Sequence, residues 1–189
     1  MIQPERKSLE ISPGEPWFIW ILANYTDFAV SSKTPVGSLI SAAKYDGSLG
    51  AMKQLISIVD EWTVKPFMLG DQKAGLSKVT AVVAVPSLPA KVISVPHRVS
   101  ASVAKKLKVE EVSNLVSKIR RTDKAKLGSK LDPSAYEVAG DLTGHTVLVV
   151  DDVFRSGKTM ESLAIQLRAA NAQVIGFCLA RAVHGMRVK

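Results

Sequence analysis

The stretch VLVVDDVFRSGKT, residues 147–159, decides the fold class of this chain. The apolar run Thr146 to Val150 is short and rich in valine, which is typical of a strand covered on both faces in a parallel sheet. The pair Asp151 and Asp152 ends the run, and a short turn follows. Gly157 to Ala170 then carries apolar residues at helical spacing, so the stretch predicts a buried strand that leads into an amphipathic helix.

A second strand is predicted directly after this helix. Gln173 to Ala180 is a further apolar run, so the unit reads strand, crossover helix, strand, a connection that is parallel and right-handed. Val79 to Val85, VTAVVAV, has the same small and β-branched composition. The predicted class is therefore α/β with a parallel Rossmann-like sheet, in which ligands bind at the carboxyl ends of the strands.

The remaining chain length suits one core. The 189 residues, 47% of them hydrophobic, are enough for a single domain and too few for two full-sized ones. Residues 1–16 are expected to form a flexible N-terminal segment, and residues 17–189 are expected to form the domain. The further expected elements are a strand at 17–25, a helix at 37–59 interrupted near Asp46 and Gly47, a helix at 97–107, a short strand within 111–116, a long loop at 118–133 and a turn at 153–156.

The charge balance points to anionic partners. The net charge is +8 and the sequence pI is about 9.6. Cationic residues outnumber acidic ones between Lys105 and Lys130, but that segment has no aromatic residue on which a nucleic-acid base could stack. Nucleic acid is therefore disfavoured as a partner, although contacts to a duplex backbone need no aromatic residues. The sequence has neither an apolar run of bilayer length nor a secretory signal at its start, so a cytoplasmic protein without membrane contact is expected.

The turn after the Asp151–Asp152 pair combines two chemical preferences. Backbone N–H groups around Ser156, Gly157, Lys158 and Thr159 can converge on a phosphate, assisted by the positive end of the helix dipole. The two carboxylates accept hydrogen bonds and suit vicinal ribose hydroxyls or water bound to Mg²⁺. A sugar phosphate meets both preferences at once.

Three other interpretations of this segment fit it less well. A P-loop requires glycine at the position of Asp152, so that reading is rejected. In a phosphate-accepting receiver domain the acidic pair lies near the N-terminus and the phosphoacceptor lies on a later strand. Here the pair lies near the C-terminus, and only one further strand is expected after it. A solvated turn with Asp152 as a capping residue needs neither the second acid nor the whole Ser-Gly-Lys-Thr sequence.

The arrangement of four apolar residues, two acids and a Ser/Thr-Gly-x-Thr turn resembles the ribose-phosphate signature of type I phosphoribosyltransferases. The chain order agrees, because VVAVPSLP (82–89) stands where that family has its first core strand and pyrophosphate loop, and residues 118–133 stand where it has a mobile hood loop. More narrowly, AAKYDG (42–47) and KIRRTDKAKLGSKLDPSAYEV (118–138) are similar to the phosphoribosyltransferase domain of the competence protein F-like family. The resemblance covers about residues 37–183 and implies a small hood built from the N-terminal part and the 118–133 loop.

The resemblance implies binding of 5-phosphoribosyl 1-pyrophosphate with Mg²⁺, and transfer of its ribosyl phosphate to a nitrogen nucleophile of unknown identity. Asp151 and Asp152 would hold the ribose hydroxyls and, through water, the metal ion, and they would be the catalytic pair. The 5′-phosphate would lie against Arg155, Ser156, Gly157, Lys158 and Thr159. The pyrophosphate would lie near Ser87, Leu88, Arg98, Arg120, Arg121, Lys124 and Lys126.

The sequence departs from the family pattern at three places. Phe154 and Arg155 replace the small or hydroxylated residues that usually precede Ser-Gly. The arginine-rich stretch that follows the first strand in competence protein F relatives is represented by PHRVSAS, residues 96–102. The paired-cysteine zinc module of such relatives is absent, since Cys178 is the single cysteine and is expected to be a buried core thiol.

Several residues outside the signature have less specific interpretations. A lysine at a helix end beside a tyrosine, as at Lys44 and Tyr45, more often packs on the protein surface than contacts a ligand or a partner. His97, His145 and His184 lack metal-ligand spacing. The aromatic residues Trp17, Phe18 and Trp20 are expected to pack on the core or to form a dimer contact.

Two hypotheses about function therefore stand. The first is a Mg²⁺-dependent phosphoribosyltransferase. The second is a non-catalytic sensor or an accessory protein of DNA uptake or processing that keeps the phosphate-binding turn. The sequence is compatible with a homodimer, but it does not define the oligomeric state.

Overall fold

A six-stranded sheet forms the centre of the molecule. The computed structural model describes residues 5–10, 16–27, 32–69, 79–86, 94–119 and 132–182. The strand order is β1-β2-β10-β9-β5-β6; β1 is antiparallel to β2, and the other neighbouring pairs are parallel. The strand bounds are β1 Glu5–Glu10, β2 Pro16–Asn24, β5 Ala81–Ala84, β6 Glu110–Glu111, β9 Thr146–Phe154 and β10 Gln173–Arg181.

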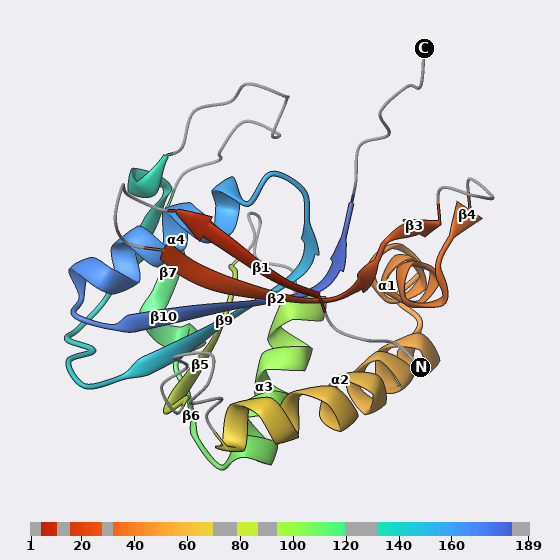
Figure 1. Ribbon diagram of the computed structural model, residues 1–189, viewed down its shortest axis with the longest axis horizontal. Coiled ribbons are helices and arrows are strands. Elements are labelled where there is room, and N and C mark those ends of the chain that lie inside the picture. Colours follow the sequence, from red (N-terminus) through yellow and green to blue (C-terminus); the bar gives the residue numbers. More distant parts are fainter. Residues whose placement is uncertain are drawn as a thin grey trace.

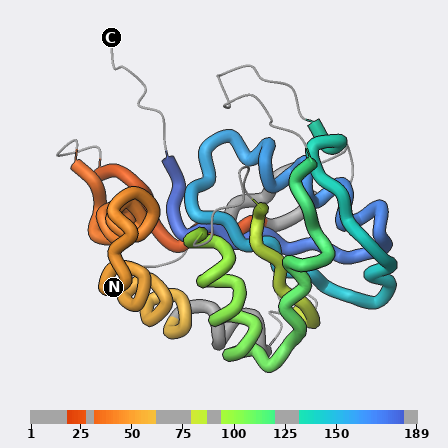
Figure 2. Tube along the Cα trace, turned by 180° about the vertical axis from the view of Figure 1, so that it is seen from behind, coloured from red at the N-terminus to blue at the C-terminus, as the bar shows by residue number. Residues whose placement is uncertain are grey.

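Helices cover both faces of this sheet (Figure 1). Helices α1, α2 and α3 lie on one face, and α4 lies on the other together with the small β7–β8 hairpin. Figure 2 shows from behind that α1 lies at the same end of the sheet as the turn between β9 and α4. The remaining bounds are β3 Thr26–Asp27, β4 Ser32–Lys33, α1 Pro35–Tyr45, α2 Leu49–Leu69, α3 Val95–Leu107, β7 Val116–Lys118, β8 Tyr136–Val138, α4 Lys158–Ala169, and 3-10 turns at Ser113–Leu115 and Pro133–Ala135.

The alternation of side chains along β9 explains why both of its faces are apolar. Leu148 and Val150 pack with the α1–α3 layer, whereas Val147 and Val149 pack with α4 and the β7–β8 hairpin. All four are fully buried. The hydrophobic free energy of burying them on two faces fixes β9 in the middle of the sheet, and this places the residues that follow Val150 at its carboxyl edge.

The predicted α/β fold with a parallel Rossmann-like sheet is confirmed. The strand, helix and strand of the C-terminal unit are β9, α4 and β10, and β9 pairs with β10 in parallel. The predicted helix interruption near Asp46 and Gly47 separates α1 from α2, and Gly47 has a positive φ of 65°.

Some element boundaries differ from the predictions. β9 continues to Phe154 because Val153 and Phe154 pair with Ala180 and Arg181 of β10, whereas the sequence predicts a turn from Val153 onward. The short strand expected within 111–116 is divided between β6 and β7 by a 3-10 turn. The sequence predicts a flexible segment at 1–16, yet residues 5–10 form β1 along β2.

Helix α1 is fixed firmly to the edge of the sheet. The Thr34 hydroxyl caps the helix by accepting a hydrogen bond from the Gly37 N–H at 3.0 Å, and it donates one to the Asn24 carbonyl at 2.6 Å. The Thr34 N–H donates to the Tyr25 carbonyl at 3.1 Å. Gly37 lies so close that a Cβ there would be 2.0 Å from the Tyr25 carbonyl oxygen, so only glycine permits this approach.

In the described part of the chain, no helix combines the length and the apolar character needed to cross a membrane.

Candidate functional site

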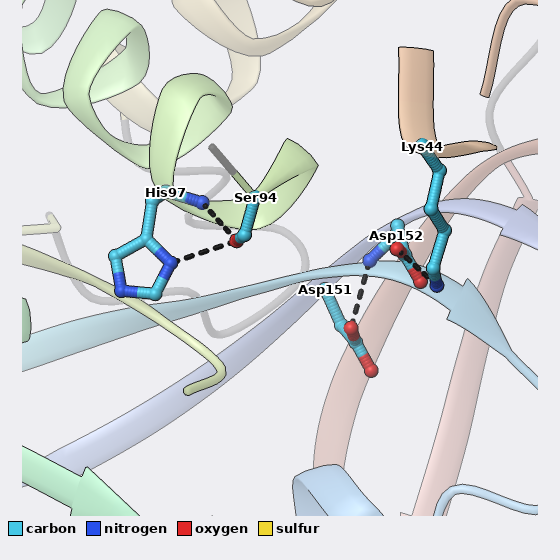
Figure 3. Close-up of polar contacts among 5 residues, drawn as sticks. All are labelled: Lys44, Ser94, His97, Asp151 and Asp152. Atoms are coloured by element: carbon cyan, nitrogen blue, oxygen red, sulfur yellow. Dashed lines mark hydrogen bonds and ion pairs between the residues drawn. The ribbon is translucent and has the colours of Figure 1, made fainter. Parts of the chain in front are cut away.

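The two carboxylates of the signature belong to the second half of strand β9, whereas the sequence predicts them directly after the strand. Residues 151 and 152 are neighbours in an extended strand, so their side chains leave it in different directions (Figure 3). The Asp152 side chain turns toward α1, and Asp151 points away from it. The Asp152 N–H donates a hydrogen bond of 2.8 Å to Oδ1 of Asp151, which holds one oxygen of that carboxylate against the backbone.

An ion pair joins Asp152 to the helix layer. Nζ of Lys44, in the last turn of α1, lies 2.6 Å from Oδ2 of Asp152. The Asp152 side chain is 10% exposed and that of Lys44 is 34% exposed. Burial by itself lowers the pKa of Lys44, but attraction to Asp152, and then to Asp151, outweighs this effect and raises the pKa. The sequence favours surface packing for Lys44, and the two partners of this contact are 108 residues apart, so local spacing does not indicate it.

Asp151 lies in a different environment, on the side of the β7–β8 hairpin. Burial, followed by repulsion from Asp152, raises the pKa of Asp151 to about 7. The charge of Asp151 acts on Tyr136 and Lys118 of the hairpin. Burial and the Asp151 carboxylate both raise the pKa of Tyr136, whereas burial lowers that of Lys118 against the attraction of Asp151. Nζ of Lys118 lies 5.3 Å from the centre of the Tyr136 ring.

A cleft of about 80 Å³ opens beside Asp151 at the start of α4. Gly157 is buried, has a φ of 81° and stands at the N-cap position, where α4 has no side-chain cap. The first N–H groups of a helix have no acceptor within it, and they carry the positive end of the dipole. The cleft therefore presents unpaired backbone donors next to a carboxylate. Its lining residues are Asp151, Val153, Phe154, Arg155, Ser156, Gly157, Thr159 and Met160.

The residues predicted to bind the 5′-phosphate gather around this cleft with one exception. Arg155, Ser156, Gly157 and Thr159 line it, and half-buried Lys158 does not. Phe154, which departs from the family pattern, is 3% exposed and packs into the core beneath α4. Its bulk is therefore accommodated by the core.

Most of the residues predicted to contact pyrophosphate lie outside the described part of the chain. These are Ser87, Leu88, Arg120, Arg121, Lys124 and Lys126. Arg98 is described and is exposed in the first turn of α3. Helix α3 follows β5 in the chain, as the resemblance requires for a pyrophosphate contact, and no contact brings Arg98 to the acidic pair within the described residues.

The other residues considered from the sequence have structural partners. The hydroxyl of Ser94 caps α3 by accepting from the His97 N–H, and it also lies 2.8 Å from Nδ1 of His97 (Figure 3). His145 lies 3.3 Å from the Thr80 hydroxyl, and His184 is outside the described residues. Cys178 is fully buried and contacts the sulfur of Met160 at 3.1 Å, so the prediction of a core thiol is confirmed. Trp20 is half-buried against the α1–α3 core; the side chains of Trp17 and Phe18 are outside the described part.

Comparison with known proteins adds a family similarity over the second half of the chain. Residues 98–185 match the family model of the phosphoribosyl transferase domain. No curated protein matches the chain.

Among solved structures, adenine phosphoribosyltransferase from Leishmania tarentolae is 12% identical, with 93% of this chain and 94% of that one covered and a TM-score of 0.48. Adenine phosphoribosyl transferase from Trypanosoma brucei, solved with AMP, pyrophosphate and ribose-5-phosphate, is 12% identical over 93% and 86% of the two chains, with a TM-score of 0.48. Orotate phosphoribosyltransferase from Aeropyrum pernix is 16% identical over 96% and 77%, with a TM-score of 0.46.

The segment that matches the family model contains β9 with its acidic pair, the turn and α4. Residues 98–185 of this α/β chain are thus similar to the phosphoribosyl transferase domain.

Proposed function

We propose that the chain is a type I phosphoribosyltransferase of the competence protein F-like group, which binds 5-phosphoribosyl 1-pyrophosphate with Mg²⁺ and transfers the ribosyl phosphate to a nitrogen nucleophile. One observation carries the proposal. Asp151 and Asp152 stand at the carboxyl end of a buried parallel strand, and Asp151 lines a cleft formed by the uncapped N-terminus of α4.

The cleft and the acidic pair would bind different parts of the same ligand. A phosphate is stabilised by the N–H groups of the first turn of α4 and by the hydroxyls of Ser156 and Thr159. A carboxylate repels a bare phosphate but accepts hydrogen bonds from ribose hydroxyls. A ribose 5-phosphate unit that spans the cleft and the strand end satisfies both groups, and an inorganic phosphate satisfies only one.

The acidic pair also fits a divalent cation. Repulsion between Asp151 and Asp152 contributes to the raised pKa of Asp151, and a nearby cation would relieve it. Mg²⁺ is commonly held by one or two carboxylates and otherwise by water and substrate oxygens, so a pair of acids is sufficient for the proposed site. When bound, Mg²⁺ would stabilise the charge that develops on departing pyrophosphate.

The residues of this chain account for the rest of the transfer. The bond between C1 of the ribose and the pyrophosphate oxygen breaks, and its electron pair leaves with pyrophosphate. The bond from C1 to the nitrogen forms, and that nitrogen loses a proton to the departing pyrophosphate or to solvent. The sugar is positively charged in between, so a carboxylate of Asp151 or Asp152 near the ring stabilises it. Cations of the 118–133 loop that close over the pyrophosphate would exclude water from the sugar.

The proposal is tested by replacing the acidic pair. The double variant D151N D152N keeps the shape of both side chains and removes their charge, so we expect it to remain folded and to lose Mg²⁺-dependent binding of 5-phosphoribosyl 1-pyrophosphate in calorimetry. The control is E137Q, which removes one exposed carboxylate on β8, in the separate β7–β8 hairpin. Undiminished affinity in the double variant would contradict the site.

Transfer itself needs a second assay. Pyrophosphate release would be followed with wild-type protein, donor and a panel of nitrogen nucleophiles that includes nucleobases, amines and ammonia. Release that depends on both a nucleophile and the acidic pair supports turnover. Donor binding without release, together with salt-sensitive binding of duplex DNA, would favour the non-catalytic accessory role.

A further inference from the structure

The ion pair between Lys44 and Asp152 stands apart from the other contacts of the helix layer, because it ends on a carboxylate of the proposed ligand site. We infer that Lys44 is a positioning residue of that site: its ammonium group holds one oxygen of Asp152 and thereby sets the direction in which the other oxygen meets the ribose. The inference rests on the proposed function and adds a residue from α1 to it.

The contact leaves one oxygen of Asp152 for a ligand. Nζ of Lys44 takes Oδ2 at 2.6 Å, and no hydrogen bond to Oδ1 is found among the described residues. The residue as a whole is 7% exposed, so an unheld carboxylate here would have little water to stabilise it. A lysine partner satisfies the buried charge and restricts the rotation of the side chain at the same time.

The neighbouring carboxylate is held in a comparable way. Oδ1 of Asp151 accepts the Asp152 N–H at 2.8 Å. Each acid of the pair thus has one oxygen engaged by the protein. This is an arrangement in which the geometry of the two remaining oxygens is fixed before a ligand arrives, and preorganisation of that kind reduces the entropy lost on binding.

The helix that carries Lys44 is anchored independently of the ion pair. Thr34 ties the start of α1 to the backbone of residues 24 and 25 by donating two hydrogen bonds, and its hydroxyl accepts a third one from Gly37 within the helix cap. Val36, Ile40 and Ala43 are buried against the sheet. Because these contacts already fix α1, the ion pair is not required to dock the helix, and its energetic effect falls on Asp152.

A second lysine offers a matched control. Lys106, also in the last turn of its helix, pairs with Asp60 at 3.6 Å and joins α3 to α2 in the same helical layer. Asp60 is no part of the proposed site. The variants K44M and K106M therefore make the same chemical change, each removing one ion pair and one positive charge from this face of the protein.

The test is the affinity for Mg²⁺ and 5-phosphoribosyl 1-pyrophosphate, measured by calorimetry on the full chain. We expect K44M to weaken binding roughly 10- to 100-fold, as is usual when the partner that orients a ligand-binding group is lost. K106M should stay within about twofold of wild type, and K44R should recover most of the affinity. Urea unfolding of each variant shows whether it is folded.

A double-mutant cycle separates positioning from other roles of the lysine. If Lys44 acts through Asp152, then K44M should change affinity by less than about twofold in a D152N background, because the group it orients has lost its charge. A lysine that contacts the ligand directly would give additive losses, and this result would overturn the inference. So would equal effects of K44M and K106M. A wild-type protein that does not bind the donor would overturn the proposed function, whereas donor binding that K44M leaves unchanged would overturn this inference alone.

Discussion

The substitution Gly37→Ala tests whether the close contact of α1 with the sheet is as tight as the structure indicates. The added Cβ would lie 2.0 Å from the Tyr25 carbonyl oxygen and 2.9 Å from its carbon. The helix would have to move by about 1.4 Å to reach an ordinary separation of 3.4 Å. The same carbonyl accepts the hydrogen bond from Thr34, so a shift of this size would also strain that bond.

The magnitude follows from three contributions. Overpacking against backbone costs about 1–3 kcal/mol. Weakening the Thr34 bond costs about 1 kcal/mol. The better helix propensity of alanine offsets about 1 kcal/mol of this. We expect Gly37→Ala to lower the free energy of unfolding by about 2 kcal/mol.

The control is the same substitution in α2. A Cβ at Gly50 would meet only the Ser48 hydroxyl at 3.9 Å, an ordinary contact. Gly50→Ala should therefore gain helix propensity without a clash and raise the free energy of unfolding by as much as about 1 kcal/mol. Urea titrations followed by circular dichroism would measure both variants. The reasoning fails if Gly37→Ala is as stable as wild type, or if the two variants change stability in the same direction.

Two further predictions concern the groups around Asp151. The pKa of Asp151 is about 7 in the folded chain and is raised from 3.8, so the folded state holds this proton more tightly and the associated stability is lost as pH rises from about 4 to about 7. The stability of D151N relative to wild type should therefore increase across that range; a pH-independent difference would show that Asp151 is not desolvated. Oη of Tyr136 is buried and has no hydrogen-bond partner among the described residues, so Tyr136→Phe should raise the free energy of unfolding by about 1 kcal/mol in urea titrations. A loss of similar size would indicate that the hydroxyl is hydrogen-bonded in solution.

Local sequence patterns predict the elements that are apolar on both faces. Val79 to Val85 contains strand β5, and Thr146 to Val150 forms the first part of β9, because only a strand covered on two sides tolerates an uninterrupted β-branched run. The same patterns fail where charged residues interrupt the apolar run. β1 and the β7–β8 hairpin contain charged residues, and the two strands of the hairpin are separated by residues 119–135.

Some features of the candidate site follow from the local sequence, and others depend on contacts between distant segments. The cleft is formed by consecutive residues, so the order of Asp151, Ser156, Gly157 and Thr159 already predicts it. The Lys44 contact depends on the packing of α1 against the end of β2 and could not be predicted from local spacing. The raised pKa of Asp151 depends first on burial, which a local motif does not specify, and then on repulsion from the adjacent Asp152.

The central claim is that the end of β9 and the start of α4 together bind a ribosyl phosphate donor with Mg²⁺. Its most direct test is a calorimetric titration of the wild-type chain with 5-phosphoribosyl 1-pyrophosphate, with and without Mg²⁺, with ribose 5-phosphate and ATP as comparison ligands. We predict micromolar binding of the donor, about −8 kcal/mol, that strengthens with Mg²⁺ and exceeds that of both comparison ligands. Absence of binding, or equal affinity for ATP, would contradict the account.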